Sequence, residues 1–354
     1  MALKAVHVTD VPNLDNNASL SLYPSPSSRG AGNGSTTEPN FMLIGHNGNG
    51  MNELQSSDLR MKAVKENTIL SFNTAAKNPI DFVEFDVQVT KDGIPVIFHD
   101  IFIFSKYNGT IYEKRVTELS LSEFLSYGPQ RESNSKGKPL LRKTKDGKIV
   151  NREVESDHPA CTLQEAFQEV KPSIGFNIEL KFDHHIVYQS EYLNCVLQAV
   201  LQVVFQHAKE RPVIFSTFQP DAALLVKKLQ NTYPVFYLTK GGNEIYYDVR
   251  RNSLEEAIKL CIEGGLSRKL GLFLEIRLLN VPEAVYMQHL MGVDGVIVDF
   301  VQDITEAFTK MLKPCEEGVE KEILFGKVEV MGRKPQFSQN ELAFLLKLIP
   351  ELIQ

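Results

Sequence analysis

The stretch that decides the fold runs from residue 82 to residue 100 and has the sequence FVEFDVQVTKDGIPVIFHD. Side chains of a β-strand alternate between two faces, so Glu84 and Asp86 point to one side of this segment while Phe85 and Val87 point to the other. A strand with one apolar face and one acidic face predicts a sheet whose two sides meet different surroundings.

The end of this stretch must fold back on its beginning. The turn at Asp92-Gly93 is far too short for the crossover that joins parallel strands, so the strand leading to His99 is predicted to be the antiparallel half of a hairpin. An earlier apolar run, FMLIGHNG at residues 41–48, also ends near an imidazole, that of His46. Active sites of parallel α/β folds collect where strands run into loops, so both histidines are candidate catalytic residues.

The acidic face of the first strand has a counterpart later in the chain. Residues 175–181 read GFNIELK, which places Glu179 and Lys181 on one face of another strand. Two carboxylates held side by side repel each other unless a cation lies between them, and Mg²⁺ and Ca²⁺ prefer carboxylate oxygens. The pattern predicts a divalent metal held by Glu84, Asp86 and Glu179, with the charge of Lys181 beside it.

Each motif also has a simpler explanation. A single Glu-x-Asp pair is typical of a solvated strand face, and a single histidine is typical of a hydrogen-bonded structural residue. A sugar hydrolase that uses Glu84 and Asp86 as its acid and base is a further alternative, although adjacent carboxylates on one strand suit a shared metal better. The combination favours an active site, because these strands are too apolar on one side and too regularly charged on the other to be exposed edges.

Taken in order, these motifs resemble the glycerophosphodiester phosphodiesterase family, and most closely its plant branch assigned to plastids. The family pattern of His-Arg-Gly, Glu-Asn-Thr, Glu-x-Asp-Val, Thr-x-Asp-Gly, His-Asp and Glu-x-Lys has its counterparts here in His46-Asn47-Gly48, Glu66-Asn67-Thr68, Glu84-Phe85-Asp86-Val87, Thr90-Lys91-Asp92-Gly93, His99-Asp100 and Glu179-Leu180-Lys181. The resemblance covers about residues 41–313 and implies a TIM-type (β/α) barrel with a β-hairpin insertion.

The resemblance also implies an activity, the metal-dependent hydrolysis of glycerophosphodiesters to glycerol 3-phosphate and an alcohol. His46 and His99 are then expected to act as general base and acid, and Asn47 and Lys181 to bind the substrate phosphate. Asn47 stands where the family has arginine, and an amide cannot form the two parallel charged hydrogen bonds of a guanidinium, so reduced activity is expected. The alternative is a catalytically impaired member that binds phosphodiesters or a partner without turnover.

Beyond the hairpin, alternating strand and helix patterns predict a parallel sheet, but the count is one short. Parallel strands are expected near residues 43, 84, 178, 215, 236, 274 and 297, which makes seven, where a closed barrel of this family needs eight. The resemblance implies that a strand–helix unit of roughly thirty residues is missing after Gly264-Gly265. An irregular bridging segment, a less stable molecule and a gene-model or splicing error are the alternatives.

The chain divides into three parts around this domain. Residues 1–40 are rich in Ser, Pro, Gly and Asn and are expected to be disordered, either as a plastid transit peptide or as the flexible tail of a cytoplasmic protein. The domain spans residues 41–313, with an aperiodic insertion at 101–160 that predicts a long loop over the barrel mouth, its lysines either attracting an anionic substrate or simply solvated. Residues 314–354 form an extension in which Ser338 begins a predicted helix.

The composition of the chain limits the kinds of molecule that it is expected to bind. The 354 residues carry a formal net charge of −6, which argues against nucleic acid or an anionic membrane surface as the main partner. No apolar run approaches the length of a membrane span. The four cysteines, Cys161, Cys195, Cys261 and Cys315, are scattered and are expected to be reduced thiols of an intracellular protein. The expected partner is a small glycerophosphodiester, and the oligomeric state stays open.

Overall fold

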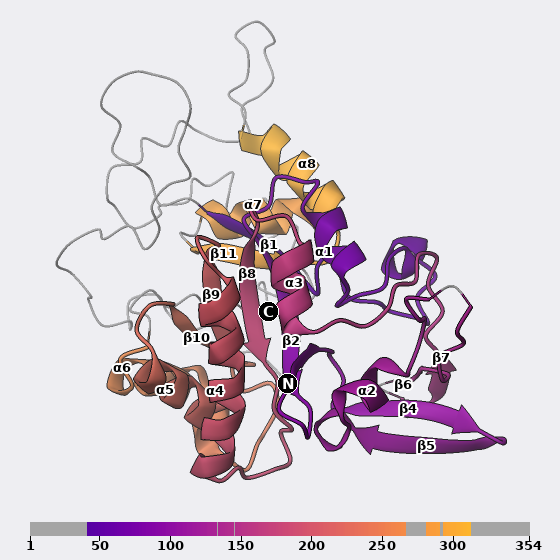
Figure 1. Ribbon diagram of the computed structural model, residues 1–354. Coiled ribbons are helices and arrows are strands. Elements are labelled where there is room, and N and C mark those ends of the chain that lie inside the picture. The colour runs from indigo at the N-terminus through magenta and orange to yellow at the C-terminus, as the bar shows by residue number, and fades with distance from the viewer. Residues whose placement is uncertain (1–40, 133, 145, 267–280, 291–292, 313–354) are drawn as a thin grey trace, which may run out of the picture.

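The computed structural model describes residues 41–132, 134–144, 146–266, 281–290 and 293–312 (Figure 1). These residues form a curled parallel sheet with helices on its outer side and a small antiparallel sheet at one end. The predictions for residues 1–40, for a strand near residue 274 and for a helix from Ser338 fall outside the described ranges.

Within the described ranges the main sheet has seven strands, of which only β3 (Pro95–Ile97) is antiparallel. The parallel strands are β1 (Met42–Gly45), β2 (Phe82–Val89), β8 (Gly175–Leu180), β9 (Val213–Thr217), β10 (Val235–Tyr237) and β11 (Gly295–Val298). Their spatial order is β10-β9-β8-β2-β1-β11, which makes the first and last strands neighbours, with Ile44 opposite Ile297. The described strands thus follow barrel order over part of a ring.

The predicted hairpin is confirmed. Strand β3 pairs antiparallel with β2, and Val87 lies opposite Ile97. Gly93 has a φ of 81°, a left-handed conformation that a glycine adopts without steric cost.

Helices cover the outer face of the sheet, and most begin where their capping residues predict. They are α1 (Ile69–Ala75), α3 (Leu163–Glu169), α4 (Ser190–His207), α5 (Pro220–Leu229), α6 (Leu254–Glu263), α7 (Pro282–Leu290) and α8 (Val301–Leu312). Thr162 and Glu165 form a capping box at the start of α3. Asn67, just before the first helix, has a φ of 56°, which lies outside the right-handed helical region, and α1 begins after its cap Thr68.

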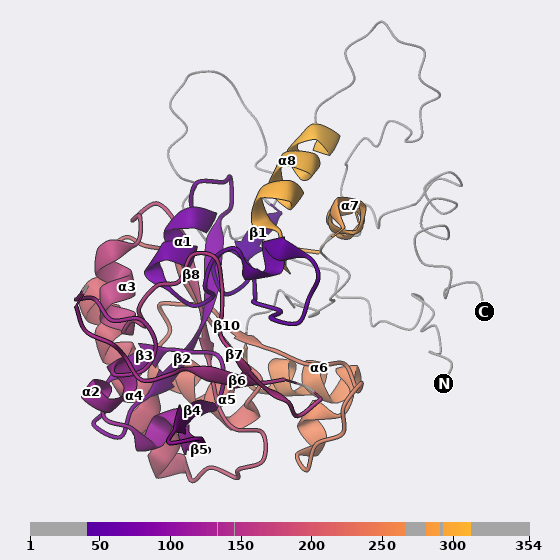
Figure 2. The same cartoon turned by 90° about the vertical axis from the view of Figure 1, so that its right-hand side faces the viewer.

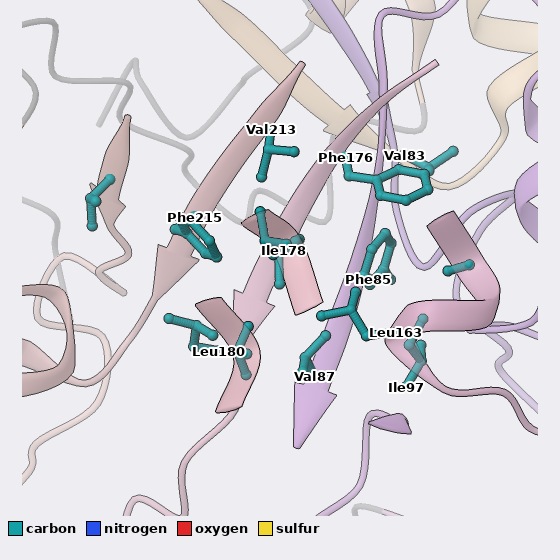
Figure 3. Packing of buried hydrophobic residues seen from close by; sticks show 14 of the residues in the cluster. Val83, Phe85, Val87, Ile97, Leu163, Phe176, Ile178, Leu180, Val213 and Phe215 are labelled. Carbon is teal, nitrogen blue, oxygen red and sulfur yellow. The ribbon is translucent and has the colours of Figure 1, made fainter. Parts of the chain in front are cut away.

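The two faces of the sheet have different contents. Outward-facing side chains of β2, β8 and β9 pack under the helices as one large apolar core (Figure 3), in which the Phe85 ring lies 5.0 Å from those of both Phe72 and Phe176. At one end of the inner face a second apolar cluster contains Ile44, Phe82, Ile214, Phe236 and Leu238. Polar residues occupy the other end, where the parallel strands end.

The prediction that residues 101–160 form a loop is wrong. This insertion forms a four-stranded antiparallel sheet, in which β4 (Phe102–Tyr107) lies between β5 (Thr110–Arg115) and β6 (Leu141–Lys143), and β7 (Ile149–Asn151) lies next to β6. It also contains a 3₁₀ turn η3 (Val116–Glu118) and the helix α2 (Leu121–Leu125). Figure 2 shows β4 and β5 at the opposite end of the molecule from α8.

Two shorter elements lie in loops near the ends of the sheet, η2 (Leu59–Lys62) and η4 (Val249–Arg251). None of the helices in the described ranges has the length and apolar character needed to cross a bilayer.

Candidate active site

The three predicted metal ligands meet on the inner face of the sheet. Strands β2 and β8 are neighbours, and their register sets Asp86 opposite Glu179 and Glu84 opposite Asn177. One carboxylate oxygen from each of Glu84, Asp86 and Glu179 lies within 4.8 Å of the others, and all three side chains are buried. The alternation read from the sequence therefore brings together carboxylates from segments almost a hundred residues apart.

Lys181 forms ion pairs with two of these three carboxylates. Lys181 Nζ lies 2.8 Å from Asp86 Oδ1 and 2.8 Å from Glu179 Oε1. Glu84 Oε2 accepts a hydrogen bond of 2.9 Å from the backbone of Asn47, whereas Oε1 is buried and has no hydrogen-bond partner among the residues that the structure describes. Burial, reinforced by the charge of Asp86, raises the pKa of Glu84 well above its ordinary value. An unpartnered buried oxygen within an all-carboxylate donor set fits a hard divalent cation such as Mg²⁺ or Ca²⁺.

Asn67 holds one of the carboxylates in place. Its Nδ2 donates to Asp86 Oδ2 at 2.9 Å, and its Oδ1 accepts from the Asp86 backbone at 3.2 Å. Burial raises the pKa of Asp86, but Lys181, His99 and Asn67 together lower it to about 2. Asp86 is thus ionised at neutral pH. The sequence analysis quoted Asn67 in a motif without assigning it this role.

His46 is oriented by a residue from the far end of the chain. Its Nδ1 lies 2.7 Å from Asp299 Oδ1, and Asp299 directly follows β11, the strand beside β1. Burial lowers the pKa of His46, but the carboxylates of Asp299, Glu84 and Asp86 outweigh this and raise it to about 10. The sequence analysis missed Asp299; its place after the last strand, which adjoins the first in barrel order, is the signal that points to it.

His99 is oriented by its neighbour Asp100, whose Oδ1 lies 2.8 Å from His99 Nδ1. The insertion supports this pair, since Arg142 of β6 donates to Asp100 Oδ1 at 3.2 Å and Arg152 binds the other oxygen of the same carboxylate. Burial raises the pKa of both Asp86 and Glu179, and the charge of His99 opposes this rise in each, so this imidazole faces the same acidic cluster.

The two arginines belong to a buried ionic network. Arg142 Nη1 lies 3.0 Å from Glu66 Oε1 and donates to the Asn52 carbonyl at 3.0 Å, and Arg152 reaches Glu66 Oε1 at 3.5 Å. Glu66 and Arg142 are almost wholly buried. Buried charges are costly unless they are paired, so this network ties the insertion firmly to the loops that carry the histidines.

Asn47 lies in the turn after β1 with a φ of 48°, and its side chain is 0% exposed. Within the described ranges, both polar atoms of its amide lack a hydrogen-bond partner. Two further polar side chains on the inner face, Asn177 and Ser216, were not predicted from the sequence; both are buried and have no side-chain hydrogen-bond partner in the described part of the chain. Every second residue of β8 and β9 faces inward, and that period is the signal that would have found them.

The model of the glycerophosphoryl diester phosphodiesterase family matches residues 46–303. The chain belongs to this family. Glycerophosphodiester phosphodiesterase GDPD1, chloroplastic, of Arabidopsis thaliana is 54% identical over 379 residues, and GDPD2 of the same plant is 53% identical over 381 residues, each alignment covering 100% of both chains.

A solved structure supports the fold. The crystal structure of a candidate glycerophosphoryl diester phosphodiesterase from Silicibacter pomeroyi aligns with a TM-score of 0.53 at 20% identity, covering 77% of this chain and 94% of that one. The predicted family and the predicted α/β class with a parallel sheet are therefore confirmed.

Proposed function

We propose that this protein hydrolyses glycerophosphodiesters to glycerol 3-phosphate and an alcohol, using Mg²⁺ or Ca²⁺ held by Glu84, Asp86 and Glu179. The observation that carries the proposal is the buried three-carboxylate cluster with its unpartnered Glu84 oxygen. Full-length relatives named glycerophosphodiester phosphodiesterases support the reaction class.

The bound metal would polarise the phosphate oxygens of the substrate. The Nδ1 atoms of His46 and His99 face Asp299 and Asp100, which leaves the Nε2 atoms to exchange protons with the substrate. One imidazole would remove a proton from the attacking oxygen, that of water or of the neighbouring glycerol hydroxyl, and the other would protonate the leaving alcohol oxygen as its bond to phosphorus breaks. Each such role contributes about 10²–10⁴-fold. If the glycerol hydroxyl attacks, water then opens the resulting cyclic phosphate to glycerol 3-phosphate. Lys181, already shared between two carboxylates, would balance the charge of the site and hold the phosphate.

Asn47 limits this chemistry. Where the family pattern has arginine, the amide offers a neutral hydrogen bond in place of two charged ones. The loss is on the order of 1.5–3 kcal/mol, or about ten- to a hundredfold in turnover. A catalytically impaired, phosphodiester-binding protein is the alternative outcome of the same substitution.

We further infer that the chain lacks one strand–helix unit of the barrel. The alignment with GDPD1 spans 379 positions and the chain has 354 residues, a difference of 25; with GDPD2 the difference is 381 − 354 = 27. A deletion of this size after Gly265 agrees with the count of seven expected parallel strands.

We also propose a plastid location, with residues 1–40 as the transit peptide, because the first relative is named as chloroplastic. Fusing residues 1–60 to a fluorescent protein in leaf cells tests this, and a diffuse cytoplasmic signal would contradict it.

The activity is tested by release of glycerol 3-phosphate from glycerophosphocholine with Mg²⁺, with Ca²⁺ and with a chelator. We expect turnover with a metal, none with the chelator, and a loss of about 10³-fold or more in Glu179→Gln, since removing a ligand removes the metal. Glu169→Gln on the exposed side of α3 is the control and should retain full activity. Turnover that resists the chelator would refute the metal assignment, and chelator-sensitive binding without product would favour the impaired protein.

A further inference from the structure

Arg251 is a buried cation at the rim of the sheet for which the mechanism has no use. It ends η4, which follows β10, and only 7% of its surface is exposed. A charge removed from water is costly unless a counter-ion or a set of hydrogen bonds compensates it. The groups around Arg251 therefore indicate which class of ligand its guanidinium binds.

The contacts of Arg251 fix the orientation of its guanidinium. Nη2 lies 2.9 Å from His184 Nδ1, and the guanidinium carbon lies 3.6 Å from the centre of the Tyr246 ring, which stacks against it. Burial and the charges of Arg251, Lys181 and Lys240 lower the pKa of His184 to about 4, so His184 is neutral and its Nδ1 accepts the hydrogen bond. Both partners are uncharged, and neither balances the charge of the arginine.

No carboxylate in the described part of the chain forms an ion pair with Arg251. Asp248 feels the charge of Arg251 but pairs with Arg250, and Glu244 pairs with Lys240. The adjacent Arg250 differs sharply, since it pairs with both Asp221 and Asp248. Within the described ranges Arg251 makes one side-chain hydrogen bond, so the rest of its planar set of donors is free to bind an anion.

This cation lies on the same rim as the carboxylate cluster. His184 is three residues beyond Lys181, and its ring meets that of Phe218, which follows β9, at 6.1 Å. The charge of Lys181 acts on His184, which places the two side chains in one electrostatic environment. In Figure 1 the segment that leads to α6 and the insertion sheet flank the ends of β2 and β8 on opposite sides.

We propose that Arg251, held by His184 and Tyr246, forms an oxyanion subsite that binds a carboxylate or phosphate group carried by the alcohol part of the substrate. The inference rests on the proposed phosphodiesterase function and adds substrate selection to it. A guanidinium binds planar oxyanions through two parallel charged hydrogen bonds, and its stacking on an aromatic ring fixes the plane in which they form. Diesters whose alcohol carries negative charge are then preferred.

One pair of substrates isolates this contact. Glycerophosphoserine and glycerophosphoethanolamine differ only by the carboxylate on the alcohol. Arg251→Gln should lower kcat/KM for glycerophosphoserine by about 10- to 100-fold relative to glycerophosphoethanolamine. Arg250→Gln is the matched control, because Arg250 is already paired, and it should leave the ratio of the two rates unchanged. An equal fall for both substrates, or no change in the ratio, overturns the proposed selection.

A binding measurement separates the subsite from the reaction. In the presence of a chelator, titration with sulfate should show a binding event in the wild type that Arg251→Gln loses and Arg250→Gln keeps. Sulfate binding that depends on Arg251 without any change in the substrate ratio would assign the subsite to a free anion. Sulfate binding that is the same in all three proteins overturns the subsite itself.

Two further checks keep these outcomes distinct. Arg251→Lys retains the charge and should keep part of the substrate preference, so it serves if the glutamine variant fails to fold. If the wild type hydrolyses neither diester, the proposed function fails, but the sulfate titration still decides whether the subsite exists.

Discussion

At position 47 the backbone conformation favours asparagine, whereas binding of the substrate phosphate would favour arginine. Its φ of 48° is a left-handed conformation that asparagine tolerates better than most residues. Its backbone N–H holds Glu84, and its carbonyl accepts a hydrogen bond of 3.0 Å from the Asn67 backbone. The residue therefore shapes the turn that carries the carboxylates, while its amide has no partner in the described part of the protein.

Asn47→Arg should have two opposite effects. Turnover of glycerophosphocholine should rise by about ten- to a hundredfold, because a charged bidentate contact to the phosphate replaces a neutral one. The free energy of unfolding should fall by about 1–2 kcal/mol, since arginine lacks the tolerance of asparagine for a positive φ. Kinetics and thermal unfolding measure the two effects separately. Asn47→Gln is the uncharged control, and unchanged turnover in the arginine variant would count against the clamp.

Asp100 should make the stability of the fold depend on acid pH. Burial raises the pKa of this carboxyl, but Arg152, His99 and Arg142 hold it well below its ordinary value. A group whose pKa is depressed by folding contributes stability above its unfolded pKa of about 3.9, and that stability is lost as the pH falls below this value. Asp100→Asn should therefore flatten the fall in the free energy of unfolding between about pH 5 and pH 2.5. Asp303→Asn at an exposed pair should leave that fall intact.

At the scale of elements, the insertion shows which strands and turns a sequence pattern can predict and which it cannot. Strand β5 is exposed over its first five residues, so it shows no alternation of apolar and polar side chains. Its turn is nevertheless encoded, since Asn108 and Gly109, with φ values of 47° and 79°, are the pair that two-residue hairpins favour. That signal was present in the sequence and was overlooked.

Local periodicity predicted β2, β8 and the inward carboxylates, because each depends on residues two positions apart. Asp299 lies 253 positions from His46, and Arg142 lies 76 positions from Glu66. No local pattern reports such pairs. Only the order of strands in the folded sheet brings the first together, and only docking of the insertion brings the second.

Removing one member of the buried network tests the role of the insertion. Arg142→Gln should destabilise the protein by about 3–5 kcal/mol, because the buried negative charges of Glu66 and Asp100 would lose one of their positively charged partners. It should also lower kcat while leaving the metal affinity of the carboxylates unchanged, since the arginine acts through His99. Arg131→Gln, at an exposed pair with Glu165, is the control and should change neither quantity. A loss of metal affinity equal to the loss of kcat would indicate general damage.

At the scale of the whole molecule, the order of the strands brings residues from both ends of the domain into one site. Strands β1 and β11 come from opposite ends of the described chain, yet they lie side by side and bring His46 to Asp299. The described sheet runs from β10 to β11 without closing a ring among its own strands. A missing strand–helix unit would affect the stability of the sheet more than the layout of the carboxylates, which lie on β2 and β8 in its middle.

Restoring the unit should therefore stabilise the protein. Inserting a strand–helix unit of about thirty residues, taken from a family member with a closed barrel, after Gly265 should raise Tm by several degrees, because it would pair strand edges and bury apolar helix faces. A Gly/Ser linker of the same length is the control and should not raise it. A chimera that melts at or below the Tm of the present chain would contradict the inferred deletion.

The small apolar cluster under the insertion should allow the insertion to unfold before the parallel sheet does. Val96, Phe98, Ile103, Val116, Leu119 and Phe124 form a core of their own, separate from the one beneath the large helices. Contiguous units of this kind open at lower free energy than the globular whole. Such opening would withdraw both arginines from Asp100 and let the His99 ring drift, while the parallel strands stay intact. In a urea titration, catalysis should therefore disappear before the far-ultraviolet circular dichroism changes, and coincident midpoints would show that the insertion and the sheet unfold together.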